Sequence, residues 1–313
     1  MPEPAAQPRA GEIDHRFAEV NGVRLHYASV GSGQPMLFLH GFPEFWRAWK
    51  NQLTEFGRDF LAVAPDLRGY NLSSKPADVD QYQLKYLVED VRGLSEHLGA
   101  ERLILVGHDW GGVVAWAFAS QYPHYLEKLI IINAPHPAVF DRELRENPAQ
   151  QQASLYMLVF RSAEAEQILS SSNYSAFDQN ILQPGVREGY FNDEDRRAYL
   201  DAWSQPGALT GGLNYYRAAH VGPPGESDQG SRQLAAQVGS LTVRVPTLVI
   251  WGEKDPYLLT GNLAGLNEFV PDLQVRRIAD GSHWVIHEKS ALVNSTMRDF
   301  IENGRESQMQ EGN

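Results

Sequence analysis

The stretch Gly107-His108-Asp109-Trp110-Gly111-Gly112 directly follows an apolar run, LILV (103–106), and precedes a segment with helical character. A strand, a tight turn and a helix in this order form a nucleophile elbow, a strained corner that lifts one side chain above the sheet. The tip is usually Ser; here it is Asp109, with Gly107 and Gly111 two positions to either side. A carboxylate is already anionic at neutral pH, so Asp109 can attack an sp3 carbon without help from a base. The simpler interpretation, a Gly-rich loop with a surface Asp, has to be weighed against the rest of the chain.

Short apolar runs alternate with longer segments of helical periodicity along most of the chain, which is typical of an α/β fold around a mostly parallel sheet. The Asn-Gly pair in FAEVNGVRLHYASVG (17–31) predicts a β-hairpin at the sheet edge. We expect buried strands at 36–39, 61–65, 103–107, 128–132, 247–251 and 274–278. Helices are expected at 45–56, 82–98, 112–121, 262–269 and 289–301.

The alternation stops between Asn133 and Leu241, where helical patterns and aromatic residues replace core strands. This insertion predicts a helical cap, residues 135–241, over the carboxyl edge of the sheet, where ligands bind in open α/β folds. The core then comprises 15–134 and 242–303. Flexible tails are expected at 1–14 and 304–313, and PPGESDQGS (223–231) is typical of a mobile loop.

Composition narrows the choice of partners. The net charge of -12 argues against binding to nucleic acid or to an anionic membrane, so we expect a small, uncharged ligand. The absence of Cys excludes disulfides, thiol nucleophiles and Cys-ligated metals. No apolar run reaches the roughly 18 residues of a membrane span. The polar, Pro-rich sequence MPEPAAQPRAGE at the start is unlike a signal peptide, and we expect a cytoplasmic protein. Composition leaves the oligomeric state open.

Two more residues follow predicted strands as Asp109 does. Asp255 in WGEKDPY comes after the strand at 247–251, and His283 in DGSHW comes after the strand at 274–278. All three side chains should therefore meet at the carboxyl edge of one sheet, in the order nucleophile, acid, histidine. The position after the strand at 128–132 is an alternative place for the acid, but it holds Asn133. Taken singly, Asp255 is a turn former and His283 a loop imidazole; together they predict a catalytic triad.

The segment HGFPE (40–44) follows the first parallel strand and predicts an oxyanion hole. The backbone N–H groups of Phe42 and Trp110 would converge on a developing oxyanion, and each such donor is typically worth ~10²–10³ in rate. Gly41 would let the backbone approach the site, and Pro43 suits a special peptide geometry. The alternative is a plain Gly-Pro turn between a strand and a helix.

With these residues in place, the chain resembles the α/β-hydrolase superfamily and, within it, the epoxide hydrolases. The resemblance spans about residues 17–301 and rests on HGFPEFW (40–46), DLRGYNLSSKP (66–76), GHDWGG (107–112), NAPHP (133–137), EKDPYL (253–258) and GSHW (281–284). It implies the α/β-hydrolase fold, with a mostly parallel sheet of about eight strands and an inserted helical cap. It also implies that an epoxide and water are converted to a vicinal diol through an ester on Asp109, with no metal or other cofactor.

The resemblance further implies two cap tyrosines, Tyr156 in SLYMLVF and Tyr216 in LNYYR. Opening an epoxide makes an alkoxide far more basic than phenolate, so protonated tyrosines can hold the ring oxygen and supply a proton. Without the resemblance, each would be a half-buried packing residue. Tyr215 competes with Tyr216 for the second role, and we choose Tyr216 because it aligns with the family's pattern.

Other aromatic residues are candidates to line the substrate pocket, although large aromatics in a cap more often belong to its core. The candidates are Trp46, Trp110, Phe160, Trp203 and Tyr215. His287 has helix-like spacing from His283, but we expect it to be exposed at the start of the last helix and not to bind a metal.

Two alternatives remain open, a haloalkane dehalogenase and a ligand-binding protein, and two others are disfavoured. A haloalkane dehalogenase uses the same Asp-His-acid set, but its anionic leaving group needs no proton donor, and Phe42 has no side-chain donor for a halide. A haloacetate dehalogenase needs an Arg near the elbow, where positions 110 and 113 hold Trp and Val. A ligand-binding protein could keep this fold without turnover. A serine esterase is disfavoured because the tip residue is Asp109.

Overall fold

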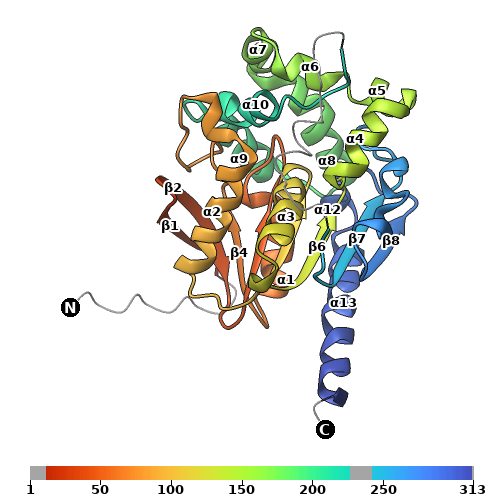
Figure 1. Cartoon of the computed structure of the whole chain (residues 1–313). Coiled ribbons are helices and arrows are strands. Elements are labelled where there is room, and N and C mark those ends of the chain that lie inside the picture. Colours follow the sequence, from red (N-terminus) through yellow and green to blue (C-terminus); the bar gives the residue numbers. More distant parts are fainter. Residues whose placement is uncertain (1–11, 226–241, 312–313) are drawn as a thin grey trace, which may run out of the picture.

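An eight-stranded sheet forms the centre of the molecule in the computed structural model, which describes residues 12–225 and 242–311 (Figure 1). Its strand order is β1-β2-β4-β3-β5-β6-β7-β8. The strands are β1 Asp14–Val20, β2 Val23–Val30, β3 Pro35–Leu39, β4 Leu61–Pro65, β5 Leu103–His108, β6 Leu126–Ile132, β7 Thr247–Gly252 and β8 Leu273–Ile278. Strands β3 to β8 run parallel, whereas β1 and β2 are antiparallel to their neighbours. The α/β fold predicted from the sequence is confirmed.

The predicted hairpin and all six predicted parallel strands are present. Asn21 and Gly22 form the hairpin turn with φ of 48° and 75°, as a tight turn between twisted strands requires. The prediction that 274–278 is a buried strand is wrong, because β8 is the edge strand and residues 274–277 are exposed. In the described residues no helix packs closely over the faces of β8, so its side chains reach solvent.

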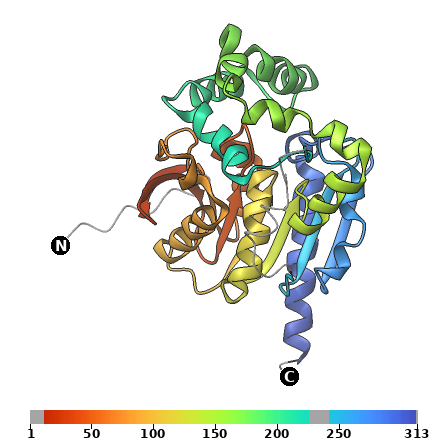
Figure 2. The same ribbon diagram turned by 45° about the horizontal axis from the view of Figure 1, so that its top comes forward.

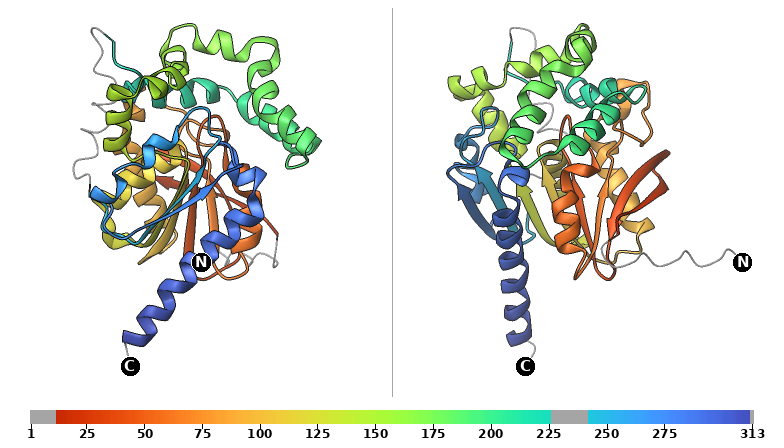
Figure 3. Two further views of the ribbon diagram at one scale, coloured as in Figure 1. Left: turned by 90° about the vertical axis from the view of Figure 1, so that its right-hand side faces the viewer. Right: turned by 180° about the vertical axis from the view of Figure 1, so that it is seen from behind.

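Helices cover both faces of the sheet (Figure 3). On one face lie α2 (Leu84–His97) and α3 (Trp110–Gln121), which pack together; on the other, α1 (Lys50–Phe56) packs against α13 (Ser290–Glu311). The short helices of the core are η1 Trp46–Trp49, η2 Val79–Tyr82, η3 Pro123–Tyr125 and α12 Val285–Glu288. The last helix, α13, runs on through residues 304–311, where the sequence predicts a flexible tail.

The helix predicted at 262–269 is absent. In its place are two short 3-10 turns, η5 Thr260–Leu263 and η6 Leu266–Glu268, with Gly265 between them at φ 72°. A left-handed residue ends a helix, which explains why the apolar spacing of this segment did not produce one.

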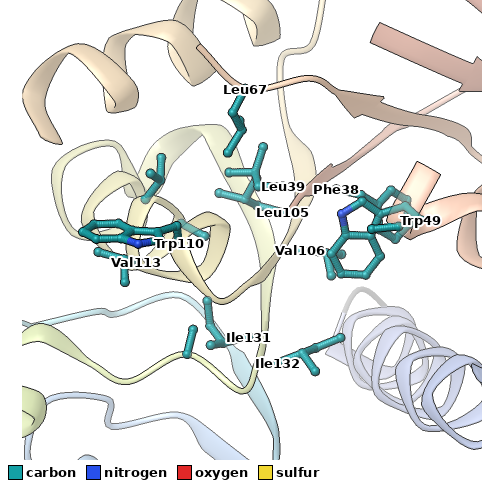
Figure 4. Packing of buried hydrophobic residues seen from close by; sticks show 14 of the residues in the cluster. Phe38, Leu39, Trp49, Leu67, Leu105, Val106, Trp110, Val113, Ile131 and Ile132 are labelled. Atoms are coloured by element: carbon teal, nitrogen blue, oxygen red, sulfur yellow. The ribbon is translucent and has the colours of Figure 1, made fainter. Parts of the chain in front are cut away.

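The central strands are buried on both faces, and this burial fixes the site above them. Figure 4 shows Leu39 of β3, Leu105 of β5 and Ile131 of β6 packed near Val113 of α3. Every residue of β5 is buried, as expected of a strand inside a parallel sheet that is covered by helices. The corner that leaves β5 is therefore anchored by the best-packed part of the core.

The cap is the helical layer between β6 and β7, and it lies over the carboxyl edge of the sheet (Figures 1 and 2). Its helices are α4 Pro137–Glu146, α5 Pro148–Ala153, α6 Tyr156–Arg161, α7 Ala165–Phe177, η4 Asp178–Leu182, α8 Gln183–Glu188, α9 Asp193–Trp203 and α10 Ala208–Ala219. Residues 226–231 of the predicted mobile loop and residues 1–11 of the predicted N-terminal tail lie outside the described residues. Within the described part, no helix combines the length and apolarity needed to cross a bilayer.

Candidate active site

The elbow predicted from GHDWGG lies between β5 and α3, with Asp109 at its tip. Asp109 has φ 50° and ψ -123°, a conformation that side-chain-bearing residues rarely adopt and that often marks a functional position. Small neighbours make the corner possible. A Cβ atom at Gly107 would lie 2.5 Å from the carbonyl oxygen of Gly111, and one at Gly111 would lie 2.1 Å from that of Leu39.

The loop after β3 meets the nucleophile through its main chain. The N–H of Phe42 donates a hydrogen bond of 2.8 Å to Oδ1 of Asp109. A Cβ at Gly41 would lie only 2.3 Å from that same oxygen, so Gly allows the approach. The Phe42–Pro43 peptide bond is cis. Trp110 starts α3 directly after Asp109, which places its N–H at the helix N-terminus beside the nucleophile.

His283 joins Asp109 and Asp255 in one triad. Its Nδ1 lies 2.7 Å from Oδ2 of Asp255, and its Nε2 lies 3.8 Å from Oδ2 of Asp109. Burial by itself would lower the pKa of His283, but the charge and hydrogen bond of Asp255, with a smaller effect of Asp109, raise the pKa to about 9. In the resting site, His283 is therefore an imidazolium ion between two carboxylates.

Asp255 is held by more groups than the sequence analysis named. Its Oδ1 accepts hydrogen bonds from the N–H groups of Tyr257 and Leu258, at 2.8 and 2.9 Å. Its Oδ2 accepts one of 2.8 Å from Nδ2 of Asn133. Burial favours a raised pKa for Asp255, but the charge and hydrogen bond of His283, together with the main-chain bonds from Leu258 and Tyr257, lower it. The position directly after β6, the alternative place for the acid, therefore holds Asn133, which donates a hydrogen bond to the acid Asp255.

The two predicted tyrosines line one cavity of about 270 Å³ together with Asp109 and His283. Tyr156 comes from α6 and Tyr216 from α10, and their ring centroids lie 6.4 Å apart. Burial, reinforced by nearby negative charge, raises the pKa of both hydroxyls well above the usual value for Tyr. Both are consequently protonated at neutral pH and able to donate a hydrogen bond.

The rest of the cavity wall is mostly apolar. It includes Phe42 and Trp284 of the core and Phe160, Leu169, Phe177 and Ile181 of the cap. A second, smaller chamber of about 30 Å³ also touches Asp109, Tyr156 and Tyr216, and its walls are Trp110, Val113, Pro135, Phe140, Met157, Val221 and Leu258. The reactive groups therefore lie between a large and a small apolar chamber, which fits an uncharged ligand with a bulky side and a small side.

Three of the proposed pocket residues do not line this cavity. Tyr215 points away, since its hydroxyl donates to the carbonyl oxygen of Arg68 at 2.9 Å. Trp203 lies behind the wall, where its ring packs against Phe177 with centroids 5.1 Å apart. Both aromatic rings pack between the cap and its surroundings and do not face this cavity.

The third is Trp46, whose main-chain N–H donates to Oδ1 of Asp66 and whose ring packs edge-on against that of His15, with centroids 4.8 Å apart. Phe160, by contrast, is part of the catalytic cavity, as proposed. Trp110 lines the smaller chamber.

A buried polar cluster beside the triad was missed by the sequence analysis. His287 is 2% exposed, so the prediction that it is exposed is wrong; its Nε2 lies 2.7 Å from Oε1 of Glu44. The hydroxyl of Tyr199 donates to the same oxygen, also at 2.7 Å. Burial would raise the pKa of Glu44, but the paired histidines hold it well below its usual value. His108 also belongs to this cluster, with its Nδ1 3.5 Å from Oε2 of Glu44. Its Nε2 lies 2.9 Å from the carbonyl oxygen of His283, so the cluster adjoins the triad.

A catalytic triad with a carboxylate as nucleophile, placed at the carboxyl edge of an eight-stranded, mostly parallel sheet, is typical of the α/β hydrolases. The family model described as alpha/beta hydrolase fold matches residues 34–290. The protein "AB hydrolase superfamily protein YfhM" of Bacillus subtilis is 39% identical over 92% of this chain and 98% of its own length. Mouse "Epoxide hydrolase 4" is 35% identical over 90% of this chain and 77% of its own length.

The similar solved structures indicate the same family as the sequence relatives. A Bacillus megaterium epoxide hydrolase in complex with an inhibitor has a TM-score of 0.84 and 41% identity, covering 92% of this chain and 100% of that one. A variant of the Bacillus megaterium enzyme with its diol product bound has a TM-score of 0.85 and 42% identity over the same shares. The chain therefore belongs to the α/β-hydrolase family and, within it, to the epoxide hydrolases.

Proposed function

We propose that this protein hydrolyses epoxides to vicinal diols through an ester formed on Asp109. One observation carries the proposal: the carboxylate of Asp109 and the protonated hydroxyls of Tyr156 and Tyr216 line one apolar cavity. A nucleophile and proton donors around an uncharged space suit a substrate that must be attacked at carbon while its oxygen is protonated.

In the first half-reaction, a carboxylate oxygen of Asp109 attacks a ring carbon, and the bond from that carbon to the ring oxygen breaks. Tyr156 and Tyr216 hydrogen-bond the ring oxygen, and one of them transfers its proton to the developing alkoxide. The products are a hydroxyalkyl ester and a tyrosinate. Proton donors of this kind typically contribute ~10²–10⁴ in rate.

In the second half-reaction, water attacks the ester carbonyl carbon. Ester formation has removed the charge of Asp109, one of the causes that raise the pKa of His283, so the imidazolium releases its proton to solvent and the neutral imidazole becomes available as a base. It takes a proton back from solvent when the charge of Asp109 is restored. His283 takes one proton from the water and returns it to the departing alkoxide, while Phe42 and Trp110 donate N–H bonds to the tetrahedral oxyanion. The second water proton is released when the carboxylate re-forms, and it restores the tyrosine.

In this scheme the two parts of the chain have separate tasks. We assign the ester chemistry to the core, residues 15–134 and 242–303, and proton donation to the cap, residues 135–241. A helical cap also keeps bulk water away from the ester until His283 can activate one molecule. The cytoplasmic location stays a prediction.

The dehalogenase alternative has less support. A halide site needs free N–H donors beside the nucleophile, but the indole of Trp110 packs edge-on against the ring of Tyr216, with centroids 5.1 Å apart. Phe42 offers only its main-chain N–H, which is bonded to Asp109. Release of halide from a haloalkane at a rate comparable to diol formation from styrene oxide would favour the dehalogenase.

Replacement of His283 tests the proposal directly. His283→Gln keeps the nucleophile but removes the base, so we expect intact-mass spectrometry to show the protein heavier by one epoxide after mixing with styrene oxide. Asp109→Ala is the matched control and should gain no mass. If the His283 variant binds epoxide but never becomes heavier, the ester mechanism is wrong.

A further inference from the structure

Gln150 of α5 is a fully buried cap residue, at 0% exposed, whose side-chain amide makes four hydrogen bonds. Its Nε2 donates to Oγ of Ser154 and to the carbonyl oxygen of Tyr257, both at 2.8 Å. Its Oε1 accepts from the N–H of Leu259 and from Nδ2 of Asn262, both at 2.9 Å. Two donors and two lone pairs are the full capacity of this amide, so no other side chain of this size can replace it.

These four bonds connect two segments that both reach the reactive groups. Tyr257, Leu259 and Asn262 belong to the acid loop, residues 255–262, which begins with the triad acid. Ser154 lies two residues before Tyr156, and its carbonyl oxygen accepts the N–H of Met157 at the start of α6. Gln150 thus ties the loop of the acid to the turn that presents the proton donor.

The ring of Tyr257 completes this connection. It is edge-on to the ring of Tyr156, with centroids 5.4 Å apart, and edge-on to the imidazole of His283, with centroids 5.5 Å apart. The N–H of Tyr257 is bonded to Asp255, while its carbonyl is bonded to Gln150. Both ends of the Tyr257 main chain are therefore held, and its ring sets the spacing between the proton donor and the base.

We propose that Gln150 is a positioning residue that fixes Tyr156 over the epoxide by tying the acid loop to the cap. The inference rests on the proposed function and deepens it, because it assigns a residue to the alkylation step. The triad acid is also held by groups to which Gln150 is not bonded, because Asp255 accepts hydrogen bonds from Asn133 and from the N–H of Leu258. Loss of Gln150 therefore weakens alkylation and spares hydrolysis of the ester.

Gln150→Met tests this assignment, since Met has a similar length and makes none of the four bonds. Single-turnover kinetics with styrene oxide and excess enzyme, followed by tryptophan fluorescence, separates alkylation from hydrolysis. We expect the alkylation rate constant to fall about 10- to 100-fold, the scale of a displacement near 1 Å, with hydrolysis within about threefold. Gln151→Met is the matched control, because the side chain of Gln151 donates to the cap carbonyl oxygens of Leu144 and Arg145 and, within the described residues, makes no bond to the acid loop.

A double-mutant cycle separates positioning from a purely structural role. If Gln150 acts through Tyr156, Gln150→Met costs less than about threefold in alkylation when Tyr156→Phe is already present. Equal losses in both backgrounds, or equal losses in both steps, overturn the assignment. If Gln150→Met does not fold, Gln150→Glu is read in the same way, because it keeps the acceptors and loses both donors.

The outcome for the native protein distinguishes the two proposals. If the native protein forms no ester with the epoxide, the proposed function fails and the role of Gln150 fails with it. If the native protein forms the ester and Gln150→Met alkylates at the native rate, only the role of Gln150 is overturned.

Discussion

The sheet edge and the cap hold their reactive groups by different means. Asp109 and Asp255 follow parallel strands, and their carboxylates accept main-chain N–H bonds from neighbouring loops. Tyr216 is held largely by ring packing, with centroids 5.5 Å from Phe42 and 5.1 Å from Trp110. A geometry set by the main chain tolerates few changes, whereas one set by side-chain packing can adjust. We therefore expect substitutions of the reactive groups at the sheet edge to abolish the reaction, and substitutions in the cap to lower its rate only in part.

The largest effect is expected at the nucleophile. Asp109→Ala removes the group that bonds to the substrate, so turnover should fall by ~10⁴ or more, as for other members of a catalytic triad. The pKa of His283 should also be lower in this variant, because the charge of Asp109 is one of the causes that raise it in the native protein. NMR titration of the His283 ring measures this shift.

The same change alters the dependence of stability on pH. The pKa of His283 is about 9 in the folded protein and near 6.5 when unfolded. A raised pKa stabilises the fold fully below pH ~6.5, and this contribution is lost as the pH rises through about 9. Denaturant unfolding should show a smaller loss over this range in Asp109→Ala than in the native protein. Asp201→Ala, which removes an exposed carboxylate of α9, is the control, and an identical effect of both variants would contradict the charge coupling.

The next largest effect is expected at Tyr216 of α10, and the adjacent Tyr215 is the comparison. Tyr216→Phe removes one of two proton donors, so alkylation in single turnover should fall by ~10- to 100-fold. Tyr215→Phe removes a hydroxyl that, in the described part of the chain, donates to the carbonyl oxygen of Arg68 outside the catalytic cavity. It should leave alkylation within about threefold and lower the free energy of unfolding by about 1 kcal/mol. The opposite pattern would exchange the roles of the two residues.

The same division between sheet edge and cap explains what the sequence could predict. Asp109, Asp255 and His283 were found because each stands directly after a strand, and parallel strands bring such positions to one edge. Tyr156 and Tyr216 came from the resemblance to a family, since nothing local distinguishes them from the other tyrosines. Their placement in the cavity agrees with that resemblance.

The misses share a physical cause, which is that the direction of a side chain depends on distant packing. Trp203 and Tyr215 are as aromatic as Phe160, but only Phe160 faces the cavity. His287 gave no local sign of its partner, because Glu44 is 243 residues away in the sequence. Gln150 likewise makes three of its four side-chain bonds to residues more than 100 positions later. A single sequence carries no record of such pairs.

The smallest effect is expected behind the cavity wall. The indole N–H of Trp203 donates to the carbonyl of Pro43, and its ring packs against Phe177; both partners line the cavity. Trp203→Phe leaves a buried carbonyl without this bond, so the free energy of unfolding should fall by about 1–3 kcal/mol. Because the reactive groups stay in place, kcat should remain within about twofold while KM rises about two- to fivefold, as expected when only uniform binding is lost. A fall in kcat with unchanged KM would instead show that this part of the cap controls the chemistry, and the contrast between the two regions would fail.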